Sequence, residues 1–483
     1  MNYRLITRIL GAILVLEGLT MLPSMGISML YGDGDAPAFA LSFCLAVAAG
    51  IPGWAFSRPE RRDLRLKEGF LTVALAWVLL SVVGALPYVL SGALPSFMDA
   101  FFETVSGLTT TGATIMTNID AQMHGILFWR SFTHWIGGMG VLVLTLAILP
   151  SGIGRASHLM RAESPGPEFS KLLPKTGSSA KVLYIIYAVM TLVEFVLLML
   201  AGLTPYDAAI HAMSTAGTGG FSNKGLSVGA YQSPAVDWII TIFMTLFSIN
   251  FALYYRMLMG HFRDALRSEE LHWFLAILVG ASLLITVNIL PLYEDFGTAI
   301  RYGFFHVSSV MSTTGFALDD FNLWPQASKM IIFILMFIGS CAGSTGGGVK
   351  VVRIALMVKQ SLLSVRRSFQ PRRISVIRFE GHGVDKDMLS QITVFFFTYV
   401  ALALLGTLVI SLRTPYDFET NFTAAITCLS NVGPGFGAVG PMGSFAGYSA
   451  LDKFILSVLM LAGRLEIFPI LALFHPAIWR KVS

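Results

Sequence analysis

Thr109-Thr110-Thr111-Gly112-Ala113 is the stretch that decides the fold, because altered copies of it recur three more times in the chain. The copies are Thr218-Gly219-Gly220-Phe221, Ser312-Thr313-Thr314-Gly315-Phe316 and Ser430-Asn431-Val432-Gly433-Pro434. Aligned on Gly112, Gly220, Gly315 and Gly433, all four carry Ser or Thr six positions earlier and Thr or Asn two positions earlier. Each copy ends a short apolar stretch set between two long ones. Four copies in one register predict four strands of a single ion filter.

The composition indicates a membrane protein. Hydrophobic residues make up 55% of the 483 residues and charged residues 13%, with a mean hydropathy of +0.70, which is too apolar for a soluble globule. The net charge of +5 predicts no nucleic-acid partner, because the basic residues lie in short loops between apolar runs. Cys44, Cys341 and Cys428 lie in or beside apolar segments without CxxC spacing, which argues against a disulfide framework or a zinc site.

Ten apolar spans approach the roughly 20 residues that a helix needs to cross a bilayer. They lie near 9–30, 38–57, 68–91, 124–149, 182–203, 234–259, 271–292, 327–362, 388–412 and 450–475. The first ends at Tyr31 without a small-residue cleavage site, so we expect a retained helix and not a signal peptide.

The charges of the connecting loops predict the orientation. Basic residues cluster at Arg4 and Arg8 and within 58–67, 155–181, 256–267, 350–386 and 480–481. The alternate loops carry acids instead, at Asp33, Asp35, Asp120, Asp319 and Asp320. Because Lys and Arg are in excess on the cytoplasmic side of membranes, ten crossings with both termini cytoplasmic satisfy every loop. We therefore expect a multi-pass membrane protein with both termini in the cytoplasm.

Segments too short to cross the membrane separate paired spans, at roughly 97–111, 205–219, 297–314 and 416–432, and their length suits re-entrant half-helices. The predicted unit is helix, re-entrant pore helix, filter loop and helix, repeated four times around one pore in an all-α integral membrane protein. The expected divisions are a two-helix N-terminal extension (1–67) and four pore repeats, at 68–150, 181–260, 270–362, with a broken second helix, and 387–483.

The filter residues suit an alkali cation. Non-helical backbone at membrane depth is tolerated only where it is buried in protein or lines water. Rings of carbonyls replace the hydration shell of such a cation, and glycine takes φ angles that let successive carbonyls face the same way. The partial negative charge at the C-terminus of each half-helix favours a cation beside it. A single Thr-Gly pair would more readily indicate helix packing through small residues, but four copies in register favour the filter.

A glycine-rich stretch interrupts the span at 327–362. It reads Gly339, Ser340, Cys341, Ala342, Gly343, Ser344, Thr345, Gly346, Gly347 and Gly348, and Lys350 and Arg353 follow it. Glycines break helices, so we predict a flexible intramembrane loop beneath the filter that must move for ions to pass. The alternative is a kinked helix packed through small residues.

Arg464 lies deep in the last apolar span, within Gly463-Arg464-Leu465-Glu466. An intramembrane charge costs about 2.5–3.5 kcal/mol on insertion scales, so it is a functional candidate. Arg464 would donate to loop carbonyls or repel cations and so form part of a gate; the alternative is a snorkelling arginine. Glu103 and Glu194 are buried structural candidates, and His134 is assigned to helix packing or the interface.

These features resemble the bacterial potassium uptake family of TrkH, within a superfamily that includes TrkG, KtrB and the plant HKT transporters. The resemblance covers essentially the whole chain and rests on the four filters, the loop 339–348 with Lys350, and Gly463-Arg464-Leu465-Glu466. The two-helix extension favours the TrkH form over the eight-helix KtrB form.

The resemblance implies a K⁺-selective pore made by one chain, a homodimer, and a cytoplasmic nucleotide-binding regulator of the TrkA type. It implies K⁺ as the transported ion, no organic cofactor, surrounding membrane lipids and no enzymatic activity. Sodium-preferring relatives carry Ser at the first filter glycine, so Gly112 favours potassium. The implied filter residues are Thr110, Thr111, Gly112, Thr218, Gly219, Gly220, Thr313, Thr314, Gly315, Asn431, Val432 and Gly433. Gly219 stands where equivalent positions carry Thr or a bulkier residue, which implies a less rigid second strand.

Three other functions are left open by the sequence. A symporter that couples K⁺ to H⁺ or Na⁺ would use the same architecture. A membrane-embedded enzyme would need facing catalytic acids or a histidine pair, and the sequence offers no such constellation. A sensor would use the basic 350–386 segment to recruit a partner, although a loop that faces anionic lipid is the simpler interpretation.

Overall fold

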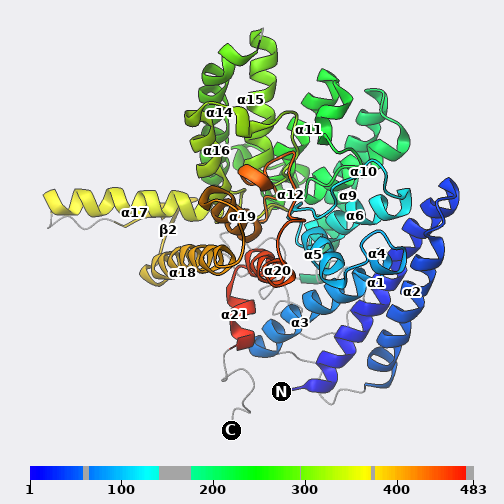
Figure 1. The fold of residues 1–483 in the computed structure, drawn as a ribbon. Coiled ribbons are helices and arrows are strands. Elements are labelled where there is room, and N and C mark those ends of the chain that lie inside the picture. Colours follow the sequence, from blue (N-terminus) through cyan, green and yellow to red (C-terminus); the bar gives the residue numbers. More distant parts are fainter. Residues whose placement is uncertain (58–64, 141–175, 294, 371–375, 475–483) are drawn as a thin grey trace.

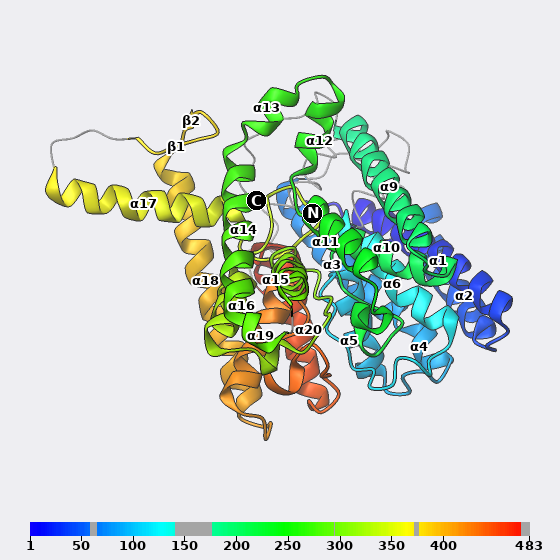
Figure 2. The same cartoon turned by 90° about the horizontal axis from the view of Figure 1, so that it is seen from above.

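The fold of this chain is taken from a computed structural model, which describes residues 1–57, 65–140, 176–293, 295–370 and 376–474. Within these ranges the regular structure is helical, apart from a small hairpin of β1 (Arg378–Phe379) and β2 (His382–Gly383). The helices gather around a common centre, and α17 (Val351–Phe369) projects from the body (Figure 1 and Figure 2). The predicted all-α architecture is confirmed at this level.

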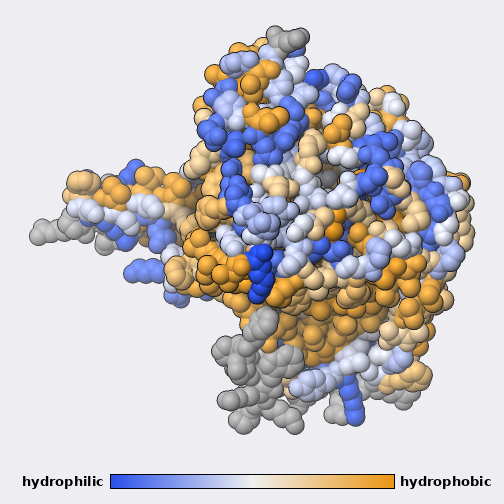
Figure 3. Space-filling view, viewed as in Figure 1, coloured by the Kyte–Doolittle hydropathy of each residue, from blue (hydrophilic) through white to orange (hydrophobic). Residues whose placement is uncertain are grey.

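Among the described residues, six helical segments are long and apolar enough to cross a bilayer. They are α1 (Tyr3–Tyr31), α2 (Ala36–Ile51) with η1 (Pro52–Phe56), α3 (Leu66–Gly84) with α4 (Leu86–Leu90), α9 (Thr176–Leu200), α14 (Glu269–Ile289) with η3 (Leu290–Leu292), and α18 (Lys386–Ser411). Apolar side chains cover a broad area below the centre of the surface in Figure 3. Such a surface is stable only against lipid or protein, as the apolar spans predict.

The predicted count of ten spans remains a prediction. Residues 141–149 of the span 124–149 lie outside the described residues, as do most of the basic cluster 155–181 and the cluster 480–481. In the part that is described, the span 124–149 contains α6 (His124–Gly138).

The span expected at 234–259 is broken, which the sequence did not predict. It consists of α11 (Pro234–Phe247) and α12 (Phe251–Leu258), which meet at 90°, and α13 (Phe262–Leu266) leads from there to α14. The Asn250 side chain accepts the N–H of Ala252 at 2.9 Å and so caps a new helix. The N–H of Phe251 donates to the Gly343 carbonyl at 3.0 Å, which fixes the new direction from outside the helix.

Two later spans are also interrupted. The span at 327–362 contains α16 (Gln326–Ile338) and α17, separated by the loop 339–348, as the glycines predict. The span at 450–475, expected to be continuous, contains α20 (Ala450–Arg464) and α21 (Phe468–Phe474). Between them Glu466 and Ile467 have φ angles of 52° and 68°. These left-handed residues end the helix directly after Arg464.

Four short helices occupy the centre of the molecule, and we call them the pore helices. They are α5 (Phe97–Leu108), α10 (Pro205–Gly217), α15 (Phe296–Met311) and α19 (Phe418–Ser430). The side chains of Thr204, Asp295 and Asp417 accept backbone N–H groups of the first turn and so cap three of them. Loops with the short helices η2 (Ser227–Tyr231), η4 (Phe321–Leu323) and η5 (Gly437–Val439) connect three of the pore helices to their following helices.

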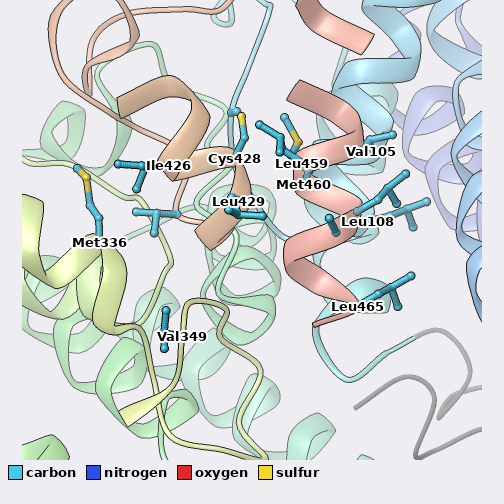
Figure 4. Close-up of a cluster of buried hydrophobic side chains, with 14 of the residues drawn as sticks. Val105, Leu108, Met336, Val349, Ile426, Cys428, Leu429, Leu459, Met460 and Leu465 are labelled. Carbon is cyan, nitrogen blue, oxygen red and sulfur yellow. The ribbon is translucent and has the colours of Figure 1, made fainter. Parts of the chain in front are cut away.

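The apolar core holds the pore helices against their neighbours. Figure 4 shows Val105 of α5, Leu429 of α19 and Met460 of α20 gathered in one buried cluster. In the N-terminal extension, a Cβ on Gly11 would overlap the backbone of Gly50, so small residues allow α1 and α2 to lie in close contact.

Candidate functional site

Each pore helix ends in the same hydrogen-bonded turn. The N–H of the residue before each filter glycine donates to the carbonyl five residues earlier. These bonds are Thr111 to Ser106 (2.9 Å), Gly219 to Ser214 (2.9 Å), Thr314 to Ser309 (2.8 Å) and Val432 to Thr427 (2.9 Å). The preceding N–H donates to the carbonyl three residues earlier in all four copies. Together the two bonds form a Schellman motif, so the chain leaves all four helices in the same way.

The residue that closes each turn is left-handed although it is not glycine. Its φ is 55° at Thr110, 53° at Thr218, 62° at Thr313 and 56° at Asn431. Left-handed backbone costs a non-glycine residue on the order of 1–2 kcal/mol, and β-branched residues are rare there. The glycine two positions later is left-handed as well, with φ between 78° and 99°. Strain repeated four times persists only because the surrounding structure imposes it, which is typical of functional segments.

The four filter strands close into a ring. A Cβ on each filter glycine would overlap a carbonyl oxygen of the next strand. Gly112 faces the carbonyl of Gly219, Gly220 that of Thr314, Gly315 that of Val432, and Gly433 that of Thr111. The fourth strand therefore returns to the first. Glycine is needed at these positions both for its φ angle and for this close approach.

The hydroxyls of the filter threonines bond to the protein. Thr111 Oγ1 shares a hydrogen bond with Thr109 Oγ1 at 2.8 Å, and Thr314 Oγ1 shares one with Ser312 Oγ at 2.6 Å. The amide of Asn431 donates to Thr111 Oγ1 at 2.9 Å. The side chains thus tie each of these two strands to its own pore helix and the fourth copy to the first. The sequence had left these partners undecided.

A buried ion pair holds the chain just beyond the first filter. Arg130 Nε donates to Glu103 Oε1 at 2.8 Å, and both side chains are at most 1% exposed. Glu103 also accepts the Thr114 hydroxyl and the Ile115 N–H, each at 2.9 Å. Arg130 donates to the Ser222 carbonyl at 3.2 Å. The pair therefore joins the first and second copies. Sequence reasoning placed Glu103 as a buried structural partner but missed Arg130, whose charge within an apolar span was the available signal.

The loop 339–348 lies against the ends of the third and fourth pore helices. The N–H of Gly347 donates to Thr313 Oγ1 at 2.7 Å. A Cβ on Gly346 would lie 2.7 Å from the Ser312 carbonyl oxygen, and one on Gly347 would lie 3.0 Å from Asn431 Cβ. The loop is thus in direct contact with two filter strands, and its glycines permit that contact.

Other bonds hold the loop to neighbouring helices. The N–H of Cys341 donates to the Ser248 carbonyl at 3.1 Å, at the bend between α11 and α12. The N–H of Ala342 donates to Glu270 Oε1 at 2.7 Å, at the start of α14. Lys350 Nζ donates to the Gly346 carbonyl within the loop. The loop is therefore an ordered segment with specific partners and not a kinked helix.

Arg464 connects three of the predicted repeats. Its guanidinium donates to the carbonyl of Thr345 in the loop at 2.7 Å, and to those of Gly137 and Gly138 at the end of α6 at 2.5 and 2.6 Å. Glu466 pairs instead with Arg353 at the start of α17. The sequence left open whether Arg464 donates to loop carbonyls, repels cations or snorkels. In the structure it donates to a loop carbonyl.

Among the described residues, no group of three or more His, Cys, Asp and Glu side chains is placed to hold a metal ion. The ring instead offers backbone oxygens, which are ligands for weakly held cations in transit. Long apolar helices around such a ring define an integral membrane protein of the cation-transporting class.

The comparisons with known proteins give the same class. The family model described as "TrkH: Cation transport protein" matches residues 36–481. The chain therefore belongs to the TrkH family, which is a family of transporters and not of enzymes.

Similar proteins include the Trk system potassium uptake protein TrkH of Salmonella typhimurium, 37% identical over 488 residues, and that of Halomonas elongata, 38% identical over 491 residues. Both alignments cover 100% of this chain and 100% of the relative. The crystal structure of the potassium transporter TrkH from Vibrio parahaemolyticus matches with a TM-score of 0.89 and 34% identity, over 99% of this chain and 100% of the other.

Proposed function

We propose that this chain takes up K⁺ across the bacterial cytoplasmic membrane through a pore lined by the four filter strands. The observation that carries the proposal is the closed ring, in which four strands share one backbone conformation and each glycine meets a carbonyl of the next strand. The similar proteins bear names of potassium uptake systems, which supports K⁺ as the ion.

The backbone conformation supports selectivity for a dehydrated alkali cation. A left-handed residue, an ordinary one and a left-handed glycine succeed each other in every strand, and such alternation turns successive carbonyls to one side. Filter hydroxyls of Thr111 and Thr314 are engaged with the pore helices, so the carbonyls remain as ligands. The four helix C-termini add partial negative charge at the same place.

The loop 339–348 and Arg464 form the gate in this proposal. The loop contacts the third and fourth strands, and Arg464 connects it to α6 of the first repeat. The loop, the helix that carries Arg464 and α6 come from different repeats, and these hydrogen bonds hold them together. A loop that moves must break the bonds. In this proposal the arrangement described here represents the closed state.

The cytoplasmic positions of both termini belong to the proposal because of the basic loops. The homodimer and a TrkA-like nucleotide-binding regulator belong to it on the strength of the family resemblance. One structural feature supports a protein partner: α17 exposes Val358, Leu362, Val365 and Phe369. Their spacing places them on one helix face. Mass measurement of the purified protein in detergent tests the dimer, and co-purification with the regulator tests the second partner.

Ion flux into liposomes that contain only this purified chain tests the function. We expect passive flux that prefers K⁺ over Na⁺ without any added coupling ion. Liposomes with the Gly315→Ser variant are the matched control, because this change alters only one filter glycine. Flux that requires H⁺ or Na⁺ on the same side would support the symporter instead, and equal K⁺ and Na⁺ flux through the wild type would contradict the selective pore.

A further inference from the structure

The second filter strand differs from the others at its middle position. The first, third and fourth strands carry Thr111, Thr314 and Val432 there, and the second carries Gly219. Gly219 does not have a positive φ, unlike the glycine that follows it. Its backbone would therefore accept a side chain, and the reason for glycine must lie in what surrounds it.

The imidazole of His134 occupies the place of the missing side chain. A Cβ on Gly219 would overlap ring atoms of His134, which lies on α6 of the first repeat and is fully buried. Nδ1 of His134 forms a 2.8 Å hydrogen bond with the carbonyl of Gly107, near the end of the first pore helix. Because a carbonyl accepts only, Nδ1 carries the proton, and the ring is fixed in orientation.

The same face of α6 holds the rest of the second strand. Arg130, His134 and Gly138 follow one another at intervals of four residues and so share that face. The His134 ring stacks on Phe221 with centroids 4.1 Å apart, and Arg130 Cζ lies 3.9 Å from the centroid of the same ring. A Cβ on Gly138 would lie 2.7 Å from Gly217 Cα.

We propose that His134 is a positioning residue for the filter, whose imidazole replaces the side chain that the other three strands supply themselves. The proposal rests on the filter assignment above. The His134 ring lies beside the Cα of Gly219, and Gly112 packs against the carbonyl of the same residue, so the position of Gly219 also affects the neighbouring strand. The lower rigidity expected of the second strand from Gly219 stays a prediction, and under this proposal His134 compensates for it from the first repeat.

A compensation experiment tests the proposal. Gly219→Thr gives the second strand the residue of the first and third strands, but it clashes with His134, and His134→Ala leaves the strand unsupported. We expect each single variant to lose at least about tenfold in the K⁺/Na⁺ flux ratio, and the double variant to recover to within about threefold of wild type, as directly interacting residues do. A double variant no more selective than Gly219→Thr, or a Gly219→Thr variant with wild-type selectivity, would overturn it.

Two controls separate this proposal from others. Ile136→Ala removes a buried side chain from the same helix, and in combination with Gly219→Thr it should restore nothing; equal recovery would show that any loosening suffices and would refute a specific role. Gly220→Ser tests the filter itself. If Gly220→Ser leaves selectivity unchanged, the filter assignment fails; if it abolishes selectivity while the compensation is absent, only the role of His134 fails.

Discussion

Replacement of Arg464 tests the gate most directly, and the structure sets the size of the effect. The side chain donates to the carbonyls of Thr345, Gly137 and Gly138. Hydrogen bonds to a charged group contribute about 1.5–3 kcal/mol each. Arg464→Met removes all three bonds. If only the bond to the loop differs between the closed and open states, the ratio of open to closed molecules rises by about 10-fold to 140-fold, because 1.4 kcal/mol corresponds to a tenfold change.

Passive K⁺ flux into liposomes measures this shift. Arg464→Lys keeps the positive charge but not the forked donor, so it distinguishes a latch from electrostatic repulsion. Flux that rises in both variants indicates the latch, and flux that rises only in Arg464→Met indicates repulsion. Arg263→Met, which removes an exposed arginine on α13, is the matched control and should not change the flux. Wild-type flux in a well-folded Arg464→Met protein would refute the gating role.

The other predictions concern the filter, the loop and the buried ion pair. Gly315→Ser should reduce the K⁺/Na⁺ flux ratio at least about tenfold, since Gly315 has a φ of 84° and packs on the Val432 carbonyl; an unchanged ratio would contradict the ring. Deletion of Gly346 and Gly347 should raise K⁺ flux because the loop loses its bond to the third filter strand, and unchanged flux would remove the loop from the gate. Arg130→Met leaves Glu103 buried without its partner, which should destabilise the protein by about 3–5 kcal/mol in thermal unfolding; a smaller loss in Glu103→Gln/Arg130→Met than in the single variant would confirm the cause.

The sequence was sufficient to locate the four short helices and the glycine turns that follow them, because the fold repeats both. One Thr-Gly pair alone predicts little. Four copies that share one register, each with Ser or Thr six positions before the glycine, predict that the four segments have the same local structure. The turn that follows each pore helix is the same Schellman motif in all four copies, and the main-chain carbonyl six positions before each glycine accepts one of its bonds. The break in the helix at 339–348 was also predictable from the sequence, because glycine destabilises helices locally.

What the sequence did not reveal depends on contacts between distant residues. The bend at Asn250 needs the Gly343 carbonyl from another repeat, and hydropathy alone describes 234–259 as one span. The contact of His134 with Gly219 was not predictable from either residue alone. A histidine in a helix and a glycine in a glycine-rich stretch are both common, and neither indicates the other. The pairing of Arg353 with Glu466 spans 113 residues and follows no periodicity.

The meeting of the fourth strand with the first has a consequence for biosynthesis. Asn431 and Thr111 bond across 320 residues, so the ring cannot exist until the ribosome has produced almost the whole chain. The loop 339–348 has by then already emerged, because it precedes the closing strand. Under the proposed function, a nascent chain therefore contains the gating loop before the ring of filter strands is complete, and this order of segments would limit ion leakage during insertion.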